Sequence, residues 1–172
     1  FSKREPYSKE NLKGDLENLE SFYKNRGFLK FNVDSSSVSL SEDKKNIFIT
    51  VNISENDLFF NNEVSYAGDL PDAIDPLSII QITQFIVPNN VFSQETLTYA
   101  EDQITSLMSN QGFSSAEVIA STEEAEKENF VDITIFIDPG QRTYVRKINF
   151  SGNKRTHDVV LRREMRQMEG SW

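Results

Sequence analysis

The fold of this chain is decided by residues 92–113, FSQETLTYAEDQITSLMSNQGF, because a second version of the same pattern occurs at residues 7–28, YSKENLKGDLENLESFYKNRGF. The two copies align at an offset of 85 residues, which places Gly27 opposite Gly112. Further along, residues 49–53 match residues 133–137 at an offset of 84, and one residue of slack in a loop explains the difference. Self-similarity at a fixed period is typical of a modular array.

Each copy predicts a helix with a defined start and end. Ser8 and Ser93 stand at the N-cap position, where a serine side chain accepts a hydrogen bond from the first amides of a helix. Apolar residues then recur at helical spacing up to the repeated glycine, which can adopt the left-handed conformation that ends a helix. The aromatic residue before each cap and the leucine at the fourth helical position have the spacing of a hydrophobic staple. These pairs are Tyr7 with Leu12 and Phe92 with Leu97.

A β-hairpin is expected after each helix. The first strands are expected at residues 31–40 and 115–122. The second strands, at 47–53 and 130–137, alternate apolar and polar residues more regularly. Alternation of this kind indicates a sheet that is covered on one face only.

A further strand and helix are expected to open each unit. Short strands are predicted before Gly68 and before Gly152. The helices that follow them are predicted at about residues 76–85 and after residue 157, where Leu161, Met165 and Met168 lie at positions i, i+4 and i+7. The predicted fold class is α+β, with tandem βααββ modules that each contain a three-stranded mixed sheet covered on one face by two helices. Residues 1–56 would end one module, 57–141 would form a whole module, and 142–172 would begin another.

The residue inventory gives little support for catalysis. The chain has 37% hydrophobic and 26% charged residues, no cysteine and a single histidine, His157. No apolar run approaches the roughly 18 residues that cross a bilayer. We therefore expect no enzymatic activity, no catalytic residues, no metal, no cofactor and no direct membrane span. The carboxylates between Glu123 and Glu128 crowd a hairpin loop without the regular ligand spacing of a calcium site, so they are expected to keep the loop solvated.

The charge distribution weighs against a nucleic-acid partner. Residues 1–141 carry 10 basic and 24 acidic groups, a net charge of −14, and residues 142–172 carry 8 basic and 3 acidic groups, a net charge of +5. RNA-binding KH domains have a related element order, but they use a Gly-x-x-Gly loop and a positive surface, and the complete module has neither. The arginines of the last segment are expected to form the solvated face of a helix.

A family resemblance is carried by residues 144–148 (YVRKI), 150–153 (FSGN) and 160–172 (VLRREMRQMEGSW), and by residues 12–28 and 137–145. These stretches resemble the polypeptide-transport-associated (POTRA) domains of β-barrel assembly factors in the outer membrane of Gram-negative bacteria. The order of the stretches resembles the end of the second domain, the whole third and the start of the fourth. The resemblance implies a periplasmic location and three kinds of partner: unfolded outer-membrane proteins, accessory assembly lipoproteins, and a C-terminal membrane barrel of the same full-length chain.

A binding mode follows from the expected sheet and from the resemblance. The more regular second strand should be central, so the first hairpin strand should form an edge, to which an extended client adds a strand through main-chain hydrogen bonds. The residues of this expected edge are Ala116, Glu117, Val118, Ile119, Ala120, Ser121 and Thr122. The resemblance also points to the helix at residues 12–23 and the strand at residues 116–121 for lipoprotein contact, with Glu17 and Glu20 as candidate residues on the helix.

Alternatives remain open at this point. The same modules occur in other transport or cell-division proteins, and they would also suit a recruiting arm of an enzyme whose catalytic domain lies outside these residues. The sequence after residue 172 would discriminate, because two more modules followed by alternating strands of about ten residues would indicate a barrel assembly factor. Residues 142–172 of one molecule can also be imagined to complete residues 1–56 of another, although a trimmed longer chain is the simpler interpretation.

Overall fold

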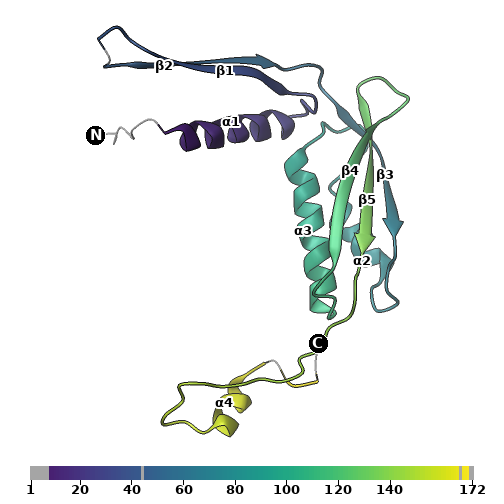
Figure 1. Cartoon of the computed structure of the whole chain (residues 1–172). Coiled ribbons are helices and arrows are strands. Elements are labelled where there is room, and N and C mark those ends of the chain that lie inside the picture. Colours follow the sequence, from purple (N-terminus) through teal and green to yellow (C-terminus); the bar gives the residue numbers. More distant parts are fainter. Residues whose placement is uncertain (1–7, 44, 167, 171–172) are drawn as a thin grey trace. The chain divides into compact units, whose positions relative to one another are not determined.

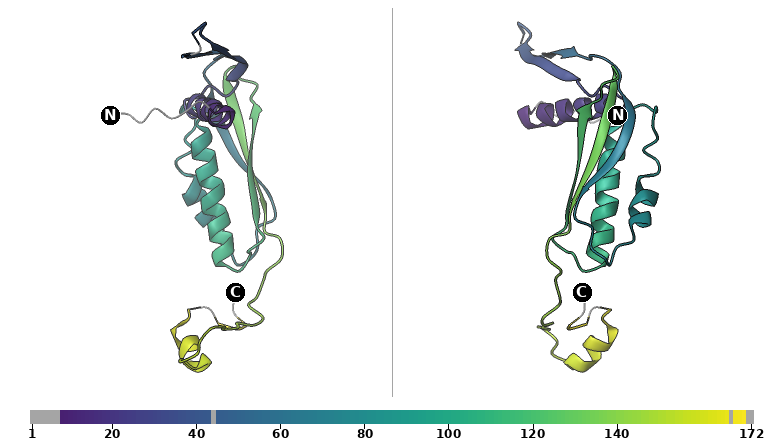
Figure 2. Two further views of the ribbon diagram at one scale, coloured as in Figure 1. Left: turned by 60° about the vertical axis from the view of Figure 1, so that its left-hand side comes forward. Right: turned by 90° about the vertical axis from the view of Figure 1, so that its right-hand side faces the viewer.

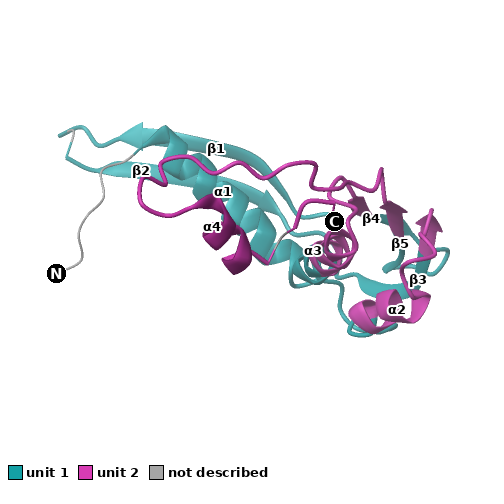
Figure 3. Ribbon diagram, turned by 90° about the horizontal axis from the view of Figure 1, so that it is seen from below, with its two compact units in different colours: residues 1–65, 84–99, 120–134 teal, residues 66–83, 100–119, 135–172 magenta. Residues whose placement is uncertain are grey.

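The computed structural model describes residues 8–43, 45–166 and 168–170 (Figure 1). The helices of these residues are α1 (Lys9–Lys24), α2 (Pro76–Thr83), α3 (Gln94–Asn110) and α4 (Asp158–Glu164). The strands are β1 (Asn32–Leu40), β2 (Ile47–Ser54), β3 (Phe60–Gly68), β4 (Glu117–Glu124) and β5 (Phe130–Asp138). The chain divides into two compact units (Figure 3). Unit 1 comprises residues 1–65, 84–99 and 120–134, and unit 2 comprises residues 66–83, 100–119 and 135–172.

The first helix of unit 1 begins and ends where the sequence predicts. The side-chain oxygen of Ser8 accepts a hydrogen bond from the amide of Asn11 at 3.4 Å, which caps α1. Gly27, just beyond the helix, has a φ of +94°, the left-handed conformation that a glycine adopts most easily. Tyr7, one half of the expected staple, lies outside the described residues.

Strands β1 and β2 form an antiparallel hairpin in unit 1. Leu40 pairs with Ile47 and Asn32 with Ser54, and the register shifts between Val33 and Ser35. The alternation of apolar residues in β2 is present, but Ile47 and Ile49 are exposed and no residue of α1 is buried. The expected covering of one face is therefore only partial among the described residues of this segment.

The three-stranded sheet has the order β3-β5-β4, so β5 is central. In unit 1 the amide of Phe60 donates to the carbonyl oxygen of Asn129, and in unit 2 the amide of Asp69 donates to that of Ile137. The residue numbers of the donor in β3 and of the acceptor in β5 rise together from the first bond to the second, so β3 and β5 are parallel. The β4-β5 hairpin is antiparallel and is closed by a hydrogen bond from the amide of Ala125 to Phe130. The sheet is therefore mixed, as predicted.

The core lies on one face of this sheet. Val131 and Ile133 in unit 1, and Ile135 and Ile137 in unit 2, alternate along β5 and are no more than 4% exposed. In unit 1, Phe92 and Leu97 are also buried. In unit 2, α2 and the second half of α3 lie along the same face (Figure 2) and bury an apolar stripe. The fully buried residues of this stripe are Ala100, Ile104 and Met108.

The last segment of unit 2 differs from the prediction. Residues 144–150 form no strand, and α4 ends at Glu164, because Met165 is extended with a ψ of 138°. Met168, expected on the same apolar stripe, lies beyond the helix and is exposed, as are Val159 and Val160. A short helix without a packed apolar face has little to stabilise it, and a strand needs a hydrogen-bonding partner. Trp172, part of the resemblance, lies outside the described residues.

Candidate functional site

The candidate site is the edge strand β4. The sheet order places this strand at one side, as the sequence predicts from the weaker alternation of the first hairpin strand. The strand begins one residue later than expected, because the amide of Ala116 donates to Phe113 in a turn. It also continues two residues further, to Glu124, and takes in part of the stretch expected to be loop. The expected edge at 116–122 is thus shifted toward the acidic turn.

The hairpin register shows which backbone groups of β4 point away from the sheet. Ala125 is bonded to Phe130, and the hydroxyl of Ser121 donates to the carbonyl oxygen of Thr134 opposite it, at 3.3 Å. Residues of an antiparallel strand turn their amide and carbonyl alternately toward and away from the partner strand. Odd-numbered residues of β4 therefore face β5, and the amides and carbonyls of Val118 and Thr122 face the edge.

The side chains of β4 leave the edge accessible. Val118 is 9% exposed on the helix-covered face, whereas Ile119 is 49% exposed on the opposite face. Ala120 and Ser121 are small, so they present little bulk to an added strand. The strand ends in Glu123 and Glu124, and Glu124 forms an ion pair with Lys30 at 2.7 Å within unit 1. Charge at the end of an edge strand limits unwanted pairing.

The two glutamates expected to contact a lipoprotein lie on exposed turns of α1. Glu17 is 3.5 Å from Lys13 and Glu20 is 2.6 Å from Lys24, so each carboxylate has a local lysine partner. The neighbouring Phe22 is half exposed, and the guanidinium of Arg26 lies 3.6 Å from the centre of its ring. The analysis of the sequence did not single out this aromatic–cation pair.

The repeated glycine has a second role that the sequence analysis missed. In unit 1 the carbonyl of Gly27 accepts the amide of Phe59 at 2.8 Å, and in unit 2 the carbonyl of Gly112 accepts the amide of Thr143 at 2.9 Å. The side chain of Asn25 also accepts the amide of Glu95, near the start of α3. These bonds join the helix end of one segment to the start of the next. The recurrence of asparagine and glycine two residues apart was the signal that could have revealed them.

The ionisable groups of the described residues do not converge on a catalytic arrangement. No group of three or more histidine, aspartate or glutamate side chains in the described ranges is placed to hold a metal ion. His157 stands at the N-cap of α4 without a capping bond from its side chain. Among the helices that the structure describes, none has the length and hydropathy needed to cross a membrane.

Hydrogen bonds shift the pKa values of Tyr23 and Glu169. The hydroxyl of Tyr23 donates to the carboxylate of Glu55 at 2.7 Å, which raises the pKa of Tyr23. The pKa of Glu169 is lowered, first by the amide of Ile148 and then by Arg162, both of which donate to the carboxylate. Arg162 also donates to the carbonyl of Ile148 at 2.7 Å. This arginine therefore binds the chain beside it, whereas the sequence analysis expected it to be solvated.

Comparisons with known proteins identify the family. The chain matches the POTRA family, described as the surface antigen variable number repeat, at residues 1–56, 62–140 and 143–172. It is 32% identical over 167 residues to the outer membrane protein assembly factor BamA of Buchnera aphidicola (subsp. Acyrthosiphon pisum). The aligned region covers 96% of this chain and 26% of that protein. It is 27% identical to BamA of Neisseria meningitidis serogroup B, over 96% of this chain and 20% of that protein. The chain thus spans about a quarter or less of these curated relatives.

Solved structures of POTRA-containing proteins also match the fold of this chain. The crystal structure of Haemophilus influenzae BamA POTRA3-5 matches with a TM-score of 0.79 and 25% identity, over 94% of this chain and 63% of that one. BamA from Haemophilus ducreyi lacking POTRA domains 1-3 matches with a TM-score of 0.63 and 15% identity, over 84% and 25%, and supports the fold alone. The two structures contain differently numbered domains, so the assignment to the second, third and fourth domains stays a prediction. The chain belongs to the POTRA family.

Proposed function

We propose that this chain is part of a periplasmic arm that receives unfolded outer-membrane β-barrel proteins and passes them toward a membrane-embedded barrel. An extended segment of the client adds to the sheet along β4. The relatives that support this proposal are named outer membrane protein assembly factors. The inventory of the described residues fits a binding role, because such binding needs no catalytic group.

The observation that carries the proposal is the geometry of the β4 edge. The amides and carbonyls of Val118 and Thr122 point away from β5, and two of the three side chains between them, Ala120 and Ser121, are small. A client that pairs here is recognised mainly through its backbone, so many sequences can bind.

The expected affinity is modest. A main-chain hydrogen bond contributes a net ~0.5–1.5 kcal/mol, and ordering an unfolded segment offsets much of the gain. A site that uses a few such bonds binds weakly and releases readily, which suits transfer of a client rather than storage.

The test is a substitution that removes one edge donor. Val118→Pro deletes the amide that faces the edge, and proline is tolerated at an outward-facing edge position. We expect Val118→Pro to reduce crosslinking to an unfolded barrel-protein peptide several-fold, whereas Val118→Ala, which loses packing but keeps the amide, should crosslink like the parent chain. Circular dichroism checks that both variants are folded. Equal crosslinking of the folded proline variant would remove β4 as the binding edge.

Lipoprotein scaffolding is the second part of the proposal, and it concerns α1. Glu17 and Glu20 have lysine partners one turn away, so a basic partner surface would have to compete with Lys13 and Lys24. Replacing both glutamates by lysine should weaken lipoprotein binding about tenfold and make the residual affinity less sensitive to salt. Replacing Asp15, on a neighbouring part of the helix, by lysine is a control for added positive charge on α1, at half the charge change of the double variant. An unchanged affinity in the double variant would exclude this surface.

A further inference from the structure

The last segment of unit 2 contains a groove between α4 and the chain on either side of it. The groove has a volume of about 400 Å³, which falls within the size range of small-molecule sites, roughly 300–1,000 Å³. Its lining combines apolar side chains with two guanidinium groups and one carboxylate. The apolar lining residues are Ile148, Val159, Met165 and Met168.

The walls of this groove are bonded to one another. The amide of Gly170 donates to the carbonyl oxygen of Val145 at 2.8 Å, which joins the chain after α4 to the chain before it. The amide of Ile148 donates to the carboxylate of Glu169 at 3.0 Å and makes the same connection. From α4, Arg162 donates to the carboxylate of Glu169 at 2.9 Å and to the carbonyl oxygen of Ile148 at 2.7 Å. These four bonds lie within the segment, so the segment itself shapes the groove.

The apolar wall of the groove is open to solvent. Val159 is 68% exposed and Met168 is 67% exposed, although both line the groove. Methionine side chains are flexible and polarisable, so Met165 and Met168 can adapt to a ligand that has no fixed shape. An unbranched alkyl chain is such a ligand. Each methylene group that it buries against this wall raises its affinity roughly fourfold.

The charged side chains of the groove indicate an anionic head group. Arg162, Arg163 and Glu169 line it, and two guanidinium groups with one carboxylate leave a net charge of +1. Arg162 is the ion-pair partner of Glu169, so Arg163 supplies the positive charge for a ligand. Val159 and Arg163 lie four residues apart on α4 and therefore share a face. A guanidinium group binds a carboxylate through two parallel hydrogen bonds, so an alkyl chain that ends in a carboxylate complements this face.

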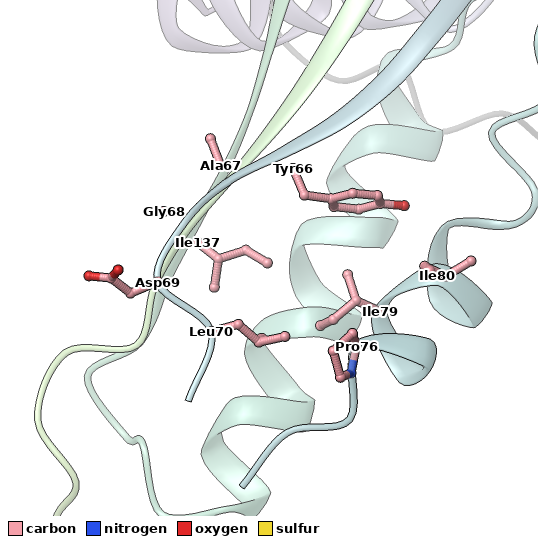
Figure 4. Close-up of a pocket in the computed structure, with 9 residues that line it drawn as sticks. All are labelled: Tyr66, Ala67, Gly68, Asp69, Leu70, Pro76, Ile79, Ile80 and Ile137. Atoms are coloured by element: carbon pink, nitrogen blue, oxygen red, sulfur yellow. The ribbon is translucent and has the colours of Figure 1, made fainter. Parts of the chain in front are cut away.

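A second apolar pocket of unit 2 has the opposite charge. It has a volume of about 160 Å³ and lies between the end of β3, α2 and β5 (Figure 4). Tyr66, Leu70, Ile79 and Ile137 direct their side chains toward this space (Figure 4). Among the described residues that line it, only Asp69 is charged. An anionic ligand is repelled there and attracted by Arg163, so it should select the groove beside α4.

We propose that the groove beside α4 binds a single-chain anionic amphiphile of the fatty-carboxylate class, with its alkyl chain along Val159 and Met168 and its carboxylate at Arg163. The ligand is one molecule held in the groove, because a concave site of this volume fits a single alkyl chain, whereas a bilayer keeps its chains inside and presents a surface of head groups. The site shares no residue with β4 or α1, so the proposed client and lipoprotein contacts do not depend on it.

The test is an NMR titration of the whole ¹⁵N-labelled chain with decanoate, kept below the concentration at which decanoate forms micelles. We expect the amides of residues 148, 159–165 and 168–169 to shift, and those of residues 66–70, at the smaller pocket, to stay in place. Octanoate is two methylene groups shorter and should bind roughly fifteenfold more weakly. Decanol has the same chain length without the charge and should bind about tenfold more weakly.

Two arginine variants test the contact with the head group. Arg163→Gln removes the charge but keeps a polar side chain, and it should lower the affinity for decanoate about tenfold while leaving the affinity for decanol unchanged. Arg155→Gln removes the same charge from the loop before α4 and is the matched control, which should bind decanoate like the parent chain. The amide signals of Ile148 and Gly170 in the ligand-free variants check that the walls are intact. Equal affinities for decanoate and decanol, unweakened binding in Arg163→Gln, or shifts seen only with micelles or with vesicles of anionic phospholipid would overturn the proposal.

Discussion

At the scale of single residues, glycines decide where strands and segments can approach one another. Gly68 has a φ of +94°, and its position against the Ile137 carbonyl leaves no room for a side chain. Gly27 and Gly112 end helices and accept the first amide of the following segment. A sequence shows that such glycines recur, but the partner of each carbonyl depends on tertiary structure.

Replacing Gly68 by alanine should destabilise the three-stranded sheet by about 2 kcal/mol or more. The free-energy cost of a positive φ in alanine adds to the cost of the collision between its Cβ and the Ile137 carbonyl. Native-state hydrogen exchange of the β5 amides measures this directly as a loss of protection. Gly152 has a similar φ of +85° but has no atom within 4 Å of a built Cβ, so Gly152→Ala is the control and should leave β5 protection unchanged. Unchanged protection in Gly68→Ala would show that the strands do not meet as described.

The carboxylate of Glu169 makes the last segment sensitive to acid. Its folded-state pKa lies below the ordinary value of 4.5, because the amide of Ile148 and the guanidinium of Arg162 favour the charged form. A depressed pKa stabilises the fold above the unfolded value, and that contribution is lost as the pH falls through the folded value. As the pH falls below 4.5 and through the folded-state pKa, the bonds to Ile148 and Arg162 should therefore weaken.

Carboxyl-detected NMR of Glu169 checks this sign, with an apparent pKa expected below 4.5. Arg162→Gln should move the pKa back toward the ordinary value, because one of the two main donors is weakened. An apparent pKa above 4.5 in the parent chain would contradict the contact.

At the scale of elements, capping connects one segment to the next. Two backbone amides at the start of α3 have side-chain acceptors. The amide of Thr96 donates to the hydroxyl of Ser93, and the amide of Glu95 donates to the side chain of Asn25. The first bond follows from the sequence, since serine at this position is a standard cap. The second bond comes from a residue 70 positions away and could not be predicted from local patterns.

Asn25→Ala should destabilise α3 by about 0.5–1.5 kcal/mol, because it leaves one amide near the helix start without its acceptor. Amide exchange in the first turn of α3 is the measurement. Asn110→Ala changes the equivalent residue of the repeat, which makes no bond to the start of α3 among the described contacts, and should leave that turn unchanged. Equal effects of the two substitutions would contradict the inter-segment cap.

The elements themselves were predictable to different degrees. The helix stripes, the mixed three-stranded sheet and the central position of the strand at Val131 and Ile133 follow from periodicity and the repeat. The strand before Gly152 and the long helix through Met168 were wrong, because strand and helix both depend on packing partners that periodicity does not reveal. The limits of β4 were displaced by one or two residues for a similar reason: a turn bond at Ala116 sets its start.

At the scale of the whole molecule, the proposed function depends on the repeated module and its sheet edges more than on any single residue. The three-stranded sheet has its two edges at β4 and β3, and an apolar pocket lies between β3, α2 and β5 in unit 2. The pocket was not predictable, since its walls come from β3, α2 and β5 and only meet in the folded state. The position of β4 at the edge of the sheet was predictable, because the more regular alternation of β5 marks it as the central strand.

The most direct test of the account follows the ¹⁵N-labelled chain during titration with an unlabelled segment of an unfolded outer-membrane β-barrel protein. If a client strand adds to β4, the amides of Val118 and Thr122 shift and become protected from solvent exchange, whereas their neighbours Ile119 and Ser121, which face β5, gain no protection. Alternating protection of this kind is produced only by strand addition at the β4 edge. Binding without any protection of Val118 and Thr122 would contradict the central claim.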